Sequence, residues 1–547
     1  MFPARAVVFF AAALMLLHGA ASAAAARPAI WFAPLPPLQT SDSRPYVGSP
    51  DFMKLFTKKA AWSNAARRVA VFKLYGEWVA HQATKAQLRR AVTDLKRRRI
   101  SIAVETGPLD TPPECGQGVE GFAGGEGLTT ASRVKAAGGT LRYLAFDEPF
   151  FYGALYTGPN ACRWNTRRVA QAVAAYVSRI RTVFPKVKFG DTEPLTTAAQ
   201  VERYKEWVDA YREATGESLA FLHLDIQYTL PRWPQVARDL EEFARSRGIP
   251  FGIIYIGDYA DANDSEWLTN AQQRFELYET NGGRPDHAVL QSWHDKPDRL
   301  LPETGRTFTN LILRYTRPRT RLELQASAGE VEGRLLAQAP VAGKPIRVSV
   351  EHAYEDSAYP SGSLLGTASA TTDANGRFRV ALTVPPGAAI VARYPGSTRY
   401  WPAYAIVRGS GAVQRNVARG RPVVASAEQA TTPATNAVDG DPTSLWIAGD
   451  FAPQWIEIDL GAPVPVAAIR LGVAQTPREG DTIHAVLGRS PEGSYRELHV
   501  FSGRTTDGQL LEYVPPTPWG DVRYLRVETR ASPSWVAWRE IEVFAPG

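Results

Sequence analysis

The chain has 547 residues, which at roughly 150 residues per domain corresponds to three or four domains. Hydrophobic residues make up 44% and charged residues 21%, a globular composition that excludes a disordered or collagen-like chain. The formal net charge is +7, from 62 basic and 55 acidic residues, and no dense Lys/Arg block is interleaved with aromatic residues. We therefore expect no nucleic-acid partner.

Residues 1–23 have the features of a secretory signal peptide. Arg5 precedes an apolar run over residues 6–17, and small residues lead to an Ala-x-Ala cleavage site after Ala23. The apolar run is shorter than the about 20 residues that a membrane-spanning helix needs. We expect a secreted or periplasmic protein without a membrane span. Export also favours a disulfide between Cys115 and Cys162, the only cysteines; two unpaired thiols are the alternative.

Short apolar runs alternate with longer helical patterns from residue 27 to residue 315. Strands that alternate with helices of this length pair in parallel through crossover connections, and eight such units predict a (β/α)8 barrel. A doubly wound open sheet is the alternative, but no Gly-rich phosphate loop follows the first strand. The expected strands are 29–36, 69–76, 101–108, 143–150, 187–194, 220–228, 250–259 and 287–295, and the clearest helices are 88–99, 169–184, 198–214 and 236–248.

Polar residues gather at the ends of these strands, where the active sites of such barrels lie. Side chains alternate along a strand, so His223, Asp225 and Gln227 share one face, which we expect to line the barrel interior. Buried polar groups are costly unless they are paired or face a ligand cavity, so carboxylates on several strands indicate a site. Any single one of them could instead be a satisfied core residue. The polar set comprises Lys73, Tyr75, Glu105, Asp147, Glu148, Asp191, Glu193, Asp225, Gln227, Tyr255, Asp258, Gln291, Trp293, His294 and Asp295.

Clustered acids beside aromatic residues indicate acid–base chemistry on an uncharged substrate. Glycoside hydrolysis needs two carboxyl groups, one protonated to assist the leaving oxygen and one ionised as nucleophile or base. Crowding raises at least one carboxyl pKa, which keeps a proton available near neutral pH. The alternative is a metal site built from Asp147, Asp191, His223 and Asp225, although no local ligand spacing supports it.

The FDEP segment at 146–149 resembles the Asn-Glu-Pro sequence that ends the fourth strand in many (β/α)8 glycoside hydrolases. The resemblance implies that Glu148 is the acid/base and that Asp147 is its orienting neighbour. Those enzymes carry a nucleophilic Glu at the end of strand seven, where this chain has Asp258. Asp225 and Glu193 are therefore competing partners of Glu148, and both retention and inversion remain open. The alternative is that FDEP is only a turn with a helix-capping acid.

Aromatic and polar residues around this position are candidates for substrate binding. The resemblance implies that Trp293 forms an apolar floor for a sugar ring, and each aromatic residue could equally belong to the core. The full set of substrate-binding candidates is Trp31, Lys73, Tyr75, Glu105, Gln227, Tyr255, Tyr259, Gln291 and Trp293.

Residues 316–410 lose the helical periodicity and read as short alternating strands of an antiparallel sandwich. The segments TDANGRFRVAL and YPGSTRYWPA resemble bacterial immunoglobulin-like modules. The resemblance implies a β-sandwich that spaces its neighbours apart.

Residues 415–547 contain NAVDGDPTSLW, QWIEIDLG and WVAWREIEVF, which resemble the discoidin (coagulation factor type C) family and its carbohydrate-binding members. The resemblance implies a jelly-roll sandwich with a structural calcium ion, held near Asp439, Asp441, Thr443 and Glu540. The alternative is an ion-free turn in which Asp441 binds backbone amides. We expect Trp446 and Trp455 in the core and His484, Trp519 and Trp535 near a sugar.

Together these patterns predict a monomeric, secreted glycoside hydrolase that acts on a polysaccharide or glycan and needs no cofactor for catalysis. A tethered binding module would raise the local concentration of catalyst at the polymer. Two alternatives remain open. One is a non-catalytic carbohydrate or cell-surface binding protein with a degenerate barrel, and the other is a carboxylate-metal hydrolase of acyl or phosphate esters.

Overall fold

The computed structural model describes residues 27–38, 48–230, 232–327, 329–359 and 362–546, so the expected signal peptide lies outside the described residues. Eight parallel strands form a closed barrel in chain order, and β1 pairs with β8 to close it. The barrel prediction is therefore confirmed. The strands are β1 (Ala29–Ala33), β2 (Val69–Tyr75), β3 (Ser101–Thr106), β4 (Leu141–Asp147), β5 (Lys188–Leu195), β6 (Leu222–Ile226), β7 (Phe251–Tyr255) and β8 (His287–Gln291).

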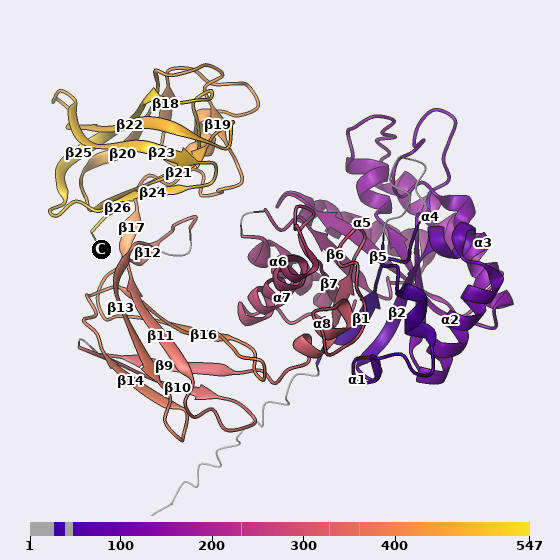
Figure 1. Ribbon diagram of the computed structural model, residues 1–547. Coiled ribbons are helices and arrows are strands. Elements are labelled where there is room, and N and C mark those ends of the chain that lie inside the picture. Colours follow the sequence, from indigo (N-terminus) through magenta and orange to yellow (C-terminus); the bar gives the residue numbers. More distant parts are fainter. Residues whose placement is uncertain (1–26, 39–47, 231, 328, 360–361, 547) are drawn as a thin grey trace, which may run out of the picture.

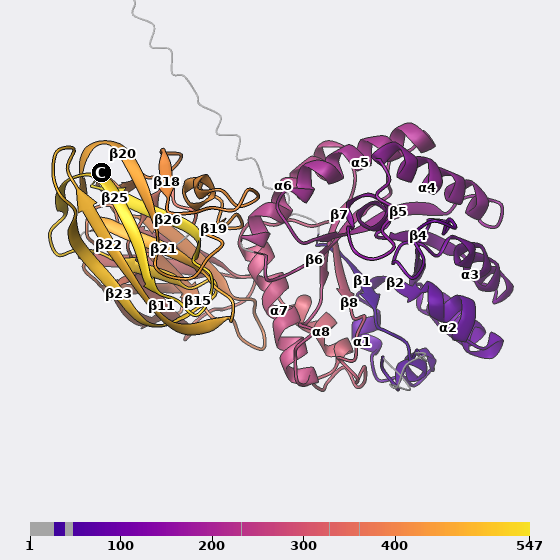
Figure 2. The same cartoon turned by 90° about the horizontal axis from the view of Figure 1, so that it is seen from above.

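Helices surround the barrel (Figure 2) and cover its apolar outer face. Residue chemistry sets their ends: a capping box of Thr84 and Gln87 starts α2, and Arg99 ends it in the left-handed conformation. The helices are α1 (Ser63–Ala66), α2 (Lys85–Arg98), α3 (Gly124–Ala136), α4 (Thr166–Arg181), α5 (Gln200–Thr215), α6 (Trp233–Ser246), α7 (Asp264–Thr280) and α8 (Phe308–Tyr315). Short turns η1 (Phe52–Phe56), η2 (Trp78–Gln82) and η3 (Phe151–Leu155) follow β1, β2 and β4.

The base of the barrel is filled by aromatic side chains. The Trp31 ring lies 4.8–5.2 Å, between centroids, from the rings of Tyr143, Phe221, His223 and His287. Trp31 is 1% exposed. The expectation that Trp31 lines a substrate subsite is therefore wrong: its side chain is enclosed by these four rings and fills the barrel interior.

Behind the barrel lies a sandwich of two sheets, ordered β14-β10-β9 and β13-β11-β15-β16. Alternating residues of its strands bury an aliphatic core that includes Val331, Ile346, Val348 and Ile390. The strands are β9 (Arg321–Ala326), β10 (Glu330–Leu336), β11 (Pro345–Glu351), β12 (Tyr354–Glu355), β13 (Leu364–Thr371), β14 (Arg377–Ala381), β15 (Ala389–Tyr394) and β16 (Ala403–Arg408).

The C-terminal part is a second sandwich, with sheets ordered β12-β17-β26-β21-β24 and β18-β20-β25-β22-β23. Trp446 is buried in its core as expected, whereas Trp455 is only half-buried and lies under the guanidinium of Arg526. Its elements are β17 (Gln414–Asn416), β18 (Val423–Ala425), η4 (Ala434–Val438), β19 (Trp446–Ile447), β20 (Gln454–Val466), β21 (Ala468–Ala474), β22 (Glu479–Arg489), β23 (Arg496–Thr506), β24 (Leu510–Tyr513), β25 (Trp519–Ala531) and β26 (Ala537–Ala545).

The three parts follow one another along the chain (Figure 1), and each junction is packed. Trp401 of the middle sandwich joins the barrel core against Phe275 and Tyr315, and its indole nitrogen donates to the Tyr315 carbonyl at 3.1 Å. Between the two sandwiches, Tyr354 stacks on Phe544 with a centroid distance of 4.0 Å. No helix of the described residues has the length and apolar character to cross a bilayer.

Candidate active site at the barrel mouth

Charged side chains from separate strands converge inside the barrel. Lys73 of β2 is buried and donates to Glu105 of β3, which also accepts hydrogen bonds from Gln291 Nε2 and Thr192 Oγ1, both at 3.2 Å. The strand register places both side chains in the interior. Tyr75 lies opposite Glu105 and Lys73 opposite Ala103, so these alternate residues of β2 and β3 all face inward. Glu105 thus has a cationic partner and two further donors.

Asp147 of β4 and Asp225 of β6 share this interior and interact electrostatically with Glu105. Burial raises the pKa of Asp147 well above its ordinary value, and repulsion from Glu105 and Glu120 adds to the effect. Burial and the charge of Glu105 raise the pKa of Asp225 to about 7, against the opposing effects of Lys73 and a hydrogen bond with the Trp293 side chain. The barrel interior therefore holds two carboxyl groups with raised pKa values, of which Asp225 has a pKa of about 7.

Glu148 follows β4 directly and occupies a strained backbone conformation. Its φ is +50°, in the left-handed region that non-glycine residues rarely adopt, and its amide donates to the Thr192 carbonyl at 3.0 Å. The residue is 8% exposed. Burial raises its pKa well above the ordinary value, and the charges of Glu120 and Asp225 raise it further. This environment favours the protonated form of Glu148, which is the form that a general acid needs.

Glu193 does not face the interior, so its expected role as catalytic partner is corrected. It lies on the outer face of β5, where its two carboxylate oxygens accept the backbone N–H groups of Phe150 at 2.7 Å and Phe151 at 2.9 Å. Asp191 is on the same face and accepts from Trp207 Nε1 at 2.6 Å. Glu193 thereby satisfies the free amides at the start of the turn after Glu148, which makes it a positioning residue.

Tyr255 and Asp258 have partners on α7. Tyr255 is 0% exposed, points outward against Phe275, and donates to Glu279 at 3.1 Å, so the expectation that it lines the site is wrong. Asp258, the expected counterpart of the strand-seven nucleophile, forms an ion pair at 3.0 Å with Arg274 of α7, which disfavours it in that role. Gln227 is exposed in the loop after β6, where it donates to Thr229.

Exposed aromatic side chains flank the mouth. Trp293 is 44% and Tyr259 is 70% exposed, their ring centroids lie 6.4 Å apart, and His294 stands edge-on between them. Tyr75 contributes a buried hydroxyl that donates to the Ser292 carbonyl at 2.5 Å. Trp293 is close enough to hydrogen-bond with Asp225, so this aromatic surface adjoins the acids. Flat exposed rings of this kind suit a sugar face.

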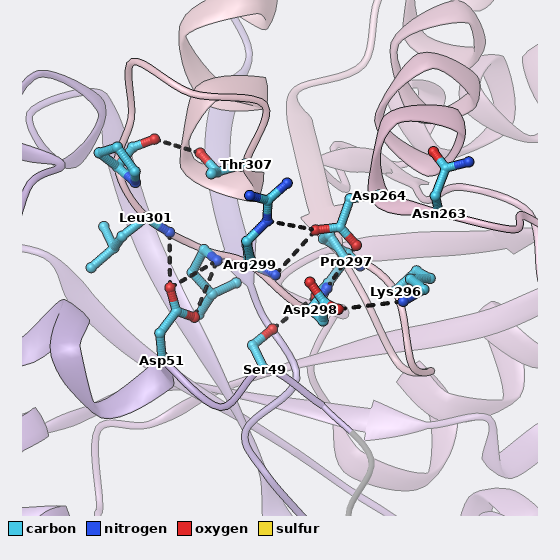
Figure 3. A network of polar contacts seen from close by, with 12 residues as sticks. Ser49, Asp51, Asn263, Asp264, Lys296, Pro297, Asp298, Arg299, Leu301 and Thr307 are labelled. Atoms are coloured by element: carbon cyan, nitrogen blue, oxygen red, sulfur yellow. Dashed lines mark hydrogen bonds and ion pairs between the residues drawn. The ribbon is translucent and has the colours of Figure 1, made fainter.

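Polar contacts anchor the long segment that carries Trp293 (Figure 3). The Asp51 carboxylate accepts the N–H groups of Leu300 and Leu301, and Asp264 accepts those of Asp298 and Arg299, all at 3.0–3.2 Å. Ser49 adds a hydrogen bond to the Pro297 carbonyl at 2.9 Å. The backbone after β8 is thus hydrogen-bonded both to the segment after β1 and to the start of α7.

Sequence reasoning missed Glu120 and Tyr152, which lie beside the acidic cluster. The two side chains hydrogen-bond to each other, and the charge of Glu120 raises the pKa of both Asp147 and Glu148. Glu120 sits in the irregular loop after β3 and Tyr152 in the turn after Glu148. Loop residues have no periodic pattern that would predict their position. The only nearby indication for Glu120 was Cys115, which precedes it in the same loop.

The disulfide between Cys115 and Cys162 is confirmed and joins these two loops. Next to it, the Gly116 amide donates to the Asn160 carbonyl and the Asn160 side chain donates to the Gln117 carbonyl, both at 2.8 Å. Gly121 has a φ of +82°, and a Cβ there would lie 3.3 Å from the Asp147 carbonyl. The loop after β3 is therefore packed directly onto the backbone of the acidic pair.

The expected metal site of Asp147, Asp191, His223 and Asp225 does not assemble. Asp191 points toward α5, while His223 pairs at 3.0 Å with His287 near the aromatic base of the barrel. Only Asp147 and Asp225 of this set interact with one another. These residues therefore provide no common coordination sphere.

In the C-terminal sandwich, Asp439, Asp441 and Thr443 lie in one turn, and Glu540 of β26 reaches it. Glu540 is 0% exposed, and both its oxygens accept the Gly440 amide at 3.2 Å. Burial and the charge of Asp439 raise the pKa of Glu540 to about 9. Asp441 accepts the amide and hydroxyl of Thr443 at 2.9 and 2.7 Å. Asp439 and the fully buried Glu540 are neighbouring carboxyl groups, and oxygen donors of this kind suit a hard cation.

The three residues of this sandwich that were expected to contact a sugar differ in their exposure. His484 is 4% exposed and packs against Trp538, so its assignment to a sugar-binding surface is wrong. Trp519 is half-buried and stacks on Tyr513. Trp535 is 47% exposed and is the one of the three that offers an open aromatic face.

The family model of the F5/8 type C domain matches residues 422–541. Similar solved structures include a family 32 carbohydrate-binding module of Clostridium perfringens NanJ in complex with galactose (16% identity, 24% of this chain and 99% of that chain, TM-score 0.22). Another is a C. perfringens module in complex with GlcNAc-α-1,4-galactose (21%, 25% and 97%, TM-score 0.21). A third is a Streptococcus pneumoniae fucose-binding module (21%, 24% and 94%, TM-score 0.21).

No curated protein matches the chain. Residues 422–541 therefore match the F5/8 type C domain, and they follow a closed barrel of eight parallel strands along the chain.

Proposed function

We propose that this protein hydrolyses O-glycosidic bonds of a glycan at the mouth of the barrel while its C-terminal domain binds carbohydrate. The observation that carries the proposal is the placement of Glu148 and Asp225. Both are carboxyl groups with raised pKa values at the ends of different strands, and the charge of Asp225 contributes to the raised pKa of Glu148. An acid that holds its proton and a second acid that titrates near neutrality are the two groups that glycoside hydrolysis requires.

In this mechanism Glu148 protonates the leaving glycosidic oxygen as the bond to the anomeric carbon breaks. Asp225, ionised above a pKa of about 7, either attacks the anomeric carbon or removes a proton from the attacking water. Asp147 and Glu120 favour the protonated form of Glu148, because their charges oppose its ionisation. Lys73 pairs with Glu105, and its positive charge lowers the pKa of Asp225, which partly offsets the repulsion from Glu105.

Substrate binding is assigned to the aromatic surface of Trp293 and Tyr259, with Tyr75 and Gln291 below it. The exposed rings offer apolar faces to a sugar, while the polar groups inside the barrel offer hydrogen bonds to its hydroxyls. The match to the F5/8 type C family supports a glycan ligand for the C-terminal domain. Tethering that domain to the barrel would raise the concentration of catalyst at a polymeric substrate.

The test is a hydrolysis screen of the full chain on polysaccharides and oligosaccharides, with new reducing ends measured. We expect turnover on at least one glycan, and NMR of the fresh product then identifies retention or inversion of the anomeric carbon. Binding to a glycan without any new reducing ends would overturn the hydrolase proposal and support the binding-only alternative, in which the barrel has no chemistry of its own.

Calcium in the C-terminal domain is part of the proposal and has its own test. Added Ca²⁺ should raise the unfolding temperature of this domain, because an ion that binds only the folded state stabilises it. Glu540→Gln replaces one carboxylate ligand of the ion by an amide and should abolish the calcium-dependent shift. Glu528→Gln, an exchange in the same domain at a residue paired with Arg530, is the matched control and should leave the shift intact. An unchanged unfolding temperature in saturating Ca²⁺ would favour the ion-free turn.

A further inference from the structure

A set of metal-ligand side chains lies on the barrel rim, outside the acidic cluster. Glu77 and His81 belong to the helical turn after β2, four residues apart, and Glu126 lies in the first turn of α3. One ligand atom from each of these side chains lies within 4.8 Å of the other two. Over the residues that the structure describes, no other trio of His, Cys, Asp and Glu meets that criterion.

The backbone at Gly76 allows the Glu126 side chain to approach Glu77 and His81 closely. Residues four apart on a helical turn present their side chains to the same side, which places Glu77 beside His81. At Gly76, which precedes them, an added Cβ would lie 2.7 Å from Glu126 Oε1 and 2.8 Å from the Glu105 carbonyl. Any larger residue would therefore displace the Glu126 carboxylate from the start of the turn.

The two carboxylates of the trio lie close together, and His81 is the basic residue beside them. Within the described parts of the chain, no Lys or Arg forms an ion pair with Glu77 or Glu126, and Glu77 Oε1 accepts a hydrogen bond from Gln82 Nε2 at 3.0 Å. A cation bound between the two carboxylates would interact favourably with both.

We propose that Glu77, His81 and Glu126 bind a divalent transition-metal ion, for which Zn²⁺ is the probe. An imidazole nitrogen with two carboxylates suits Zn²⁺, which commonly takes three protein ligands and one water, whereas Ca²⁺ and Mg²⁺ prefer oxygen ligands alone. The ion would join the turn after β2 to α3, next to the strand ends that carry Tyr75 and Glu105. This site is independent of the proposed hydrolysis.

The experiment is calorimetric titration of Zn²⁺ into the full chain after chelator treatment and removal of any histidine tag. Both cysteines are in the disulfide, so thiols do not compete for the ion. We expect one Zn²⁺ per chain and a higher unfolding temperature in its presence. His81→Ala and Glu126→Gln should each weaken Zn²⁺ binding at least about tenfold, as expected for loss of one ligand.

His352→Ala and Glu213→Gln are the matched controls, because both residues lie away from the trio, and they should bind Zn²⁺ as the wild type does. His81 and Glu77 are exposed, so their variants should retain the metal-free unfolding temperature. No heat of binding and no thermal shift for the wild type at saturating Zn²⁺, or unchanged affinity in His81→Ala, would overturn the proposal.

Discussion

At the scale of single residues, the site depends on carboxyl groups whose surroundings oppose ionisation. Burial is the largest cause of the raised pKa values of Asp147, Glu148 and Asp225, and repulsion between the acids is the next. Polar residues at strand ends were sufficient to predict Asp147, Glu148 and Asp225. Sequence reasoning could not find Glu120, because its position depends on a loop conformation that a disulfide fixes.

Asp225→Asn should change how stability depends on pH. The folded-state pKa of about 7 lies above the ordinary value of about 3.9, so the folded wild type binds an extra proton between these pH values and loses stability as pH rises through them. The variant lacks this loss. Its free energy of unfolding relative to wild type should therefore increase from pH 4 to pH 8, by the order of 1–4 kcal/mol. Denaturant unfolding at both pH values measures this, and a constant difference would contradict the assigned environment.

At the scale of elements, the site predictions depended on which face of its strand each residue occupies. Alternation places residues i and i+2 on one face, but an error of one residue in phase reverses every side chain. Asp225 and His223 do face the interior, whereas Asp191, Glu193 and Tyr255 turned out to face the helices. The polar character of a buried residue did not reveal its face, because Trp207, the Phe150 amide and Glu279 supply hydrogen-bond partners on the outer side.

The disulfide between the loops after β3 and β4 should matter for both stability and activity. Its cysteines are 47 residues apart, and closing a loop of that length stabilises the folded state by about 4 kcal/mol in the chain-entropy account. The double variant Cys115→Ala/Cys162→Ala should lose roughly 2–4 kcal/mol of unfolding free energy. Activity should fall as well, because Glu120 and Tyr152 lose their support. Unchanged unfolding and turnover would show that the remaining loop contacts suffice.

At the scale of the whole molecule, packed junctions connect the parts. Trp401 inserts from the middle sandwich into the barrel core, and Arg319 stacks 3.9 Å from its ring while pairing with Glu279. Tyr354 stacks on Phe544 between the two sandwiches, and Glu542 there accepts hydrogen bonds from Ser357 Oγ and the Ala358 amide. The change from helical to alternating period marked the end of the barrel and the start of the two sandwiches in the sequence. The junction contacts were not, because Trp401 gives no periodic signal of its own.

Trp401→Ala should uncouple the barrel from the middle sandwich. Truncating a tryptophan that is 1% exposed costs about 3–5 kcal/mol, and here the loss falls on a junction. Scanning calorimetry should show the barrel transition at a lower temperature and separated from that of the sandwiches. Trp446→Ala, a fully buried tryptophan of the C-terminal core, is the control and should affect only the last transition. Identical thermograms for wild type and Trp401→Ala would contradict a packed junction.

The central claim is tested most directly by the turnover of Glu148→Gln on the best glycan from the screen. The account predicts a fall in kcat of about 10²- to 10⁴-fold, with a smaller fall on an aryl glycoside whose leaving group needs no proton. Asp225→Asn should lose activity on both substrates. Asp258→Asn, whose parent residue is paired with Arg274, should stay close to wild type. Undiminished turnover by Glu148→Gln on the natural glycan would contradict the account.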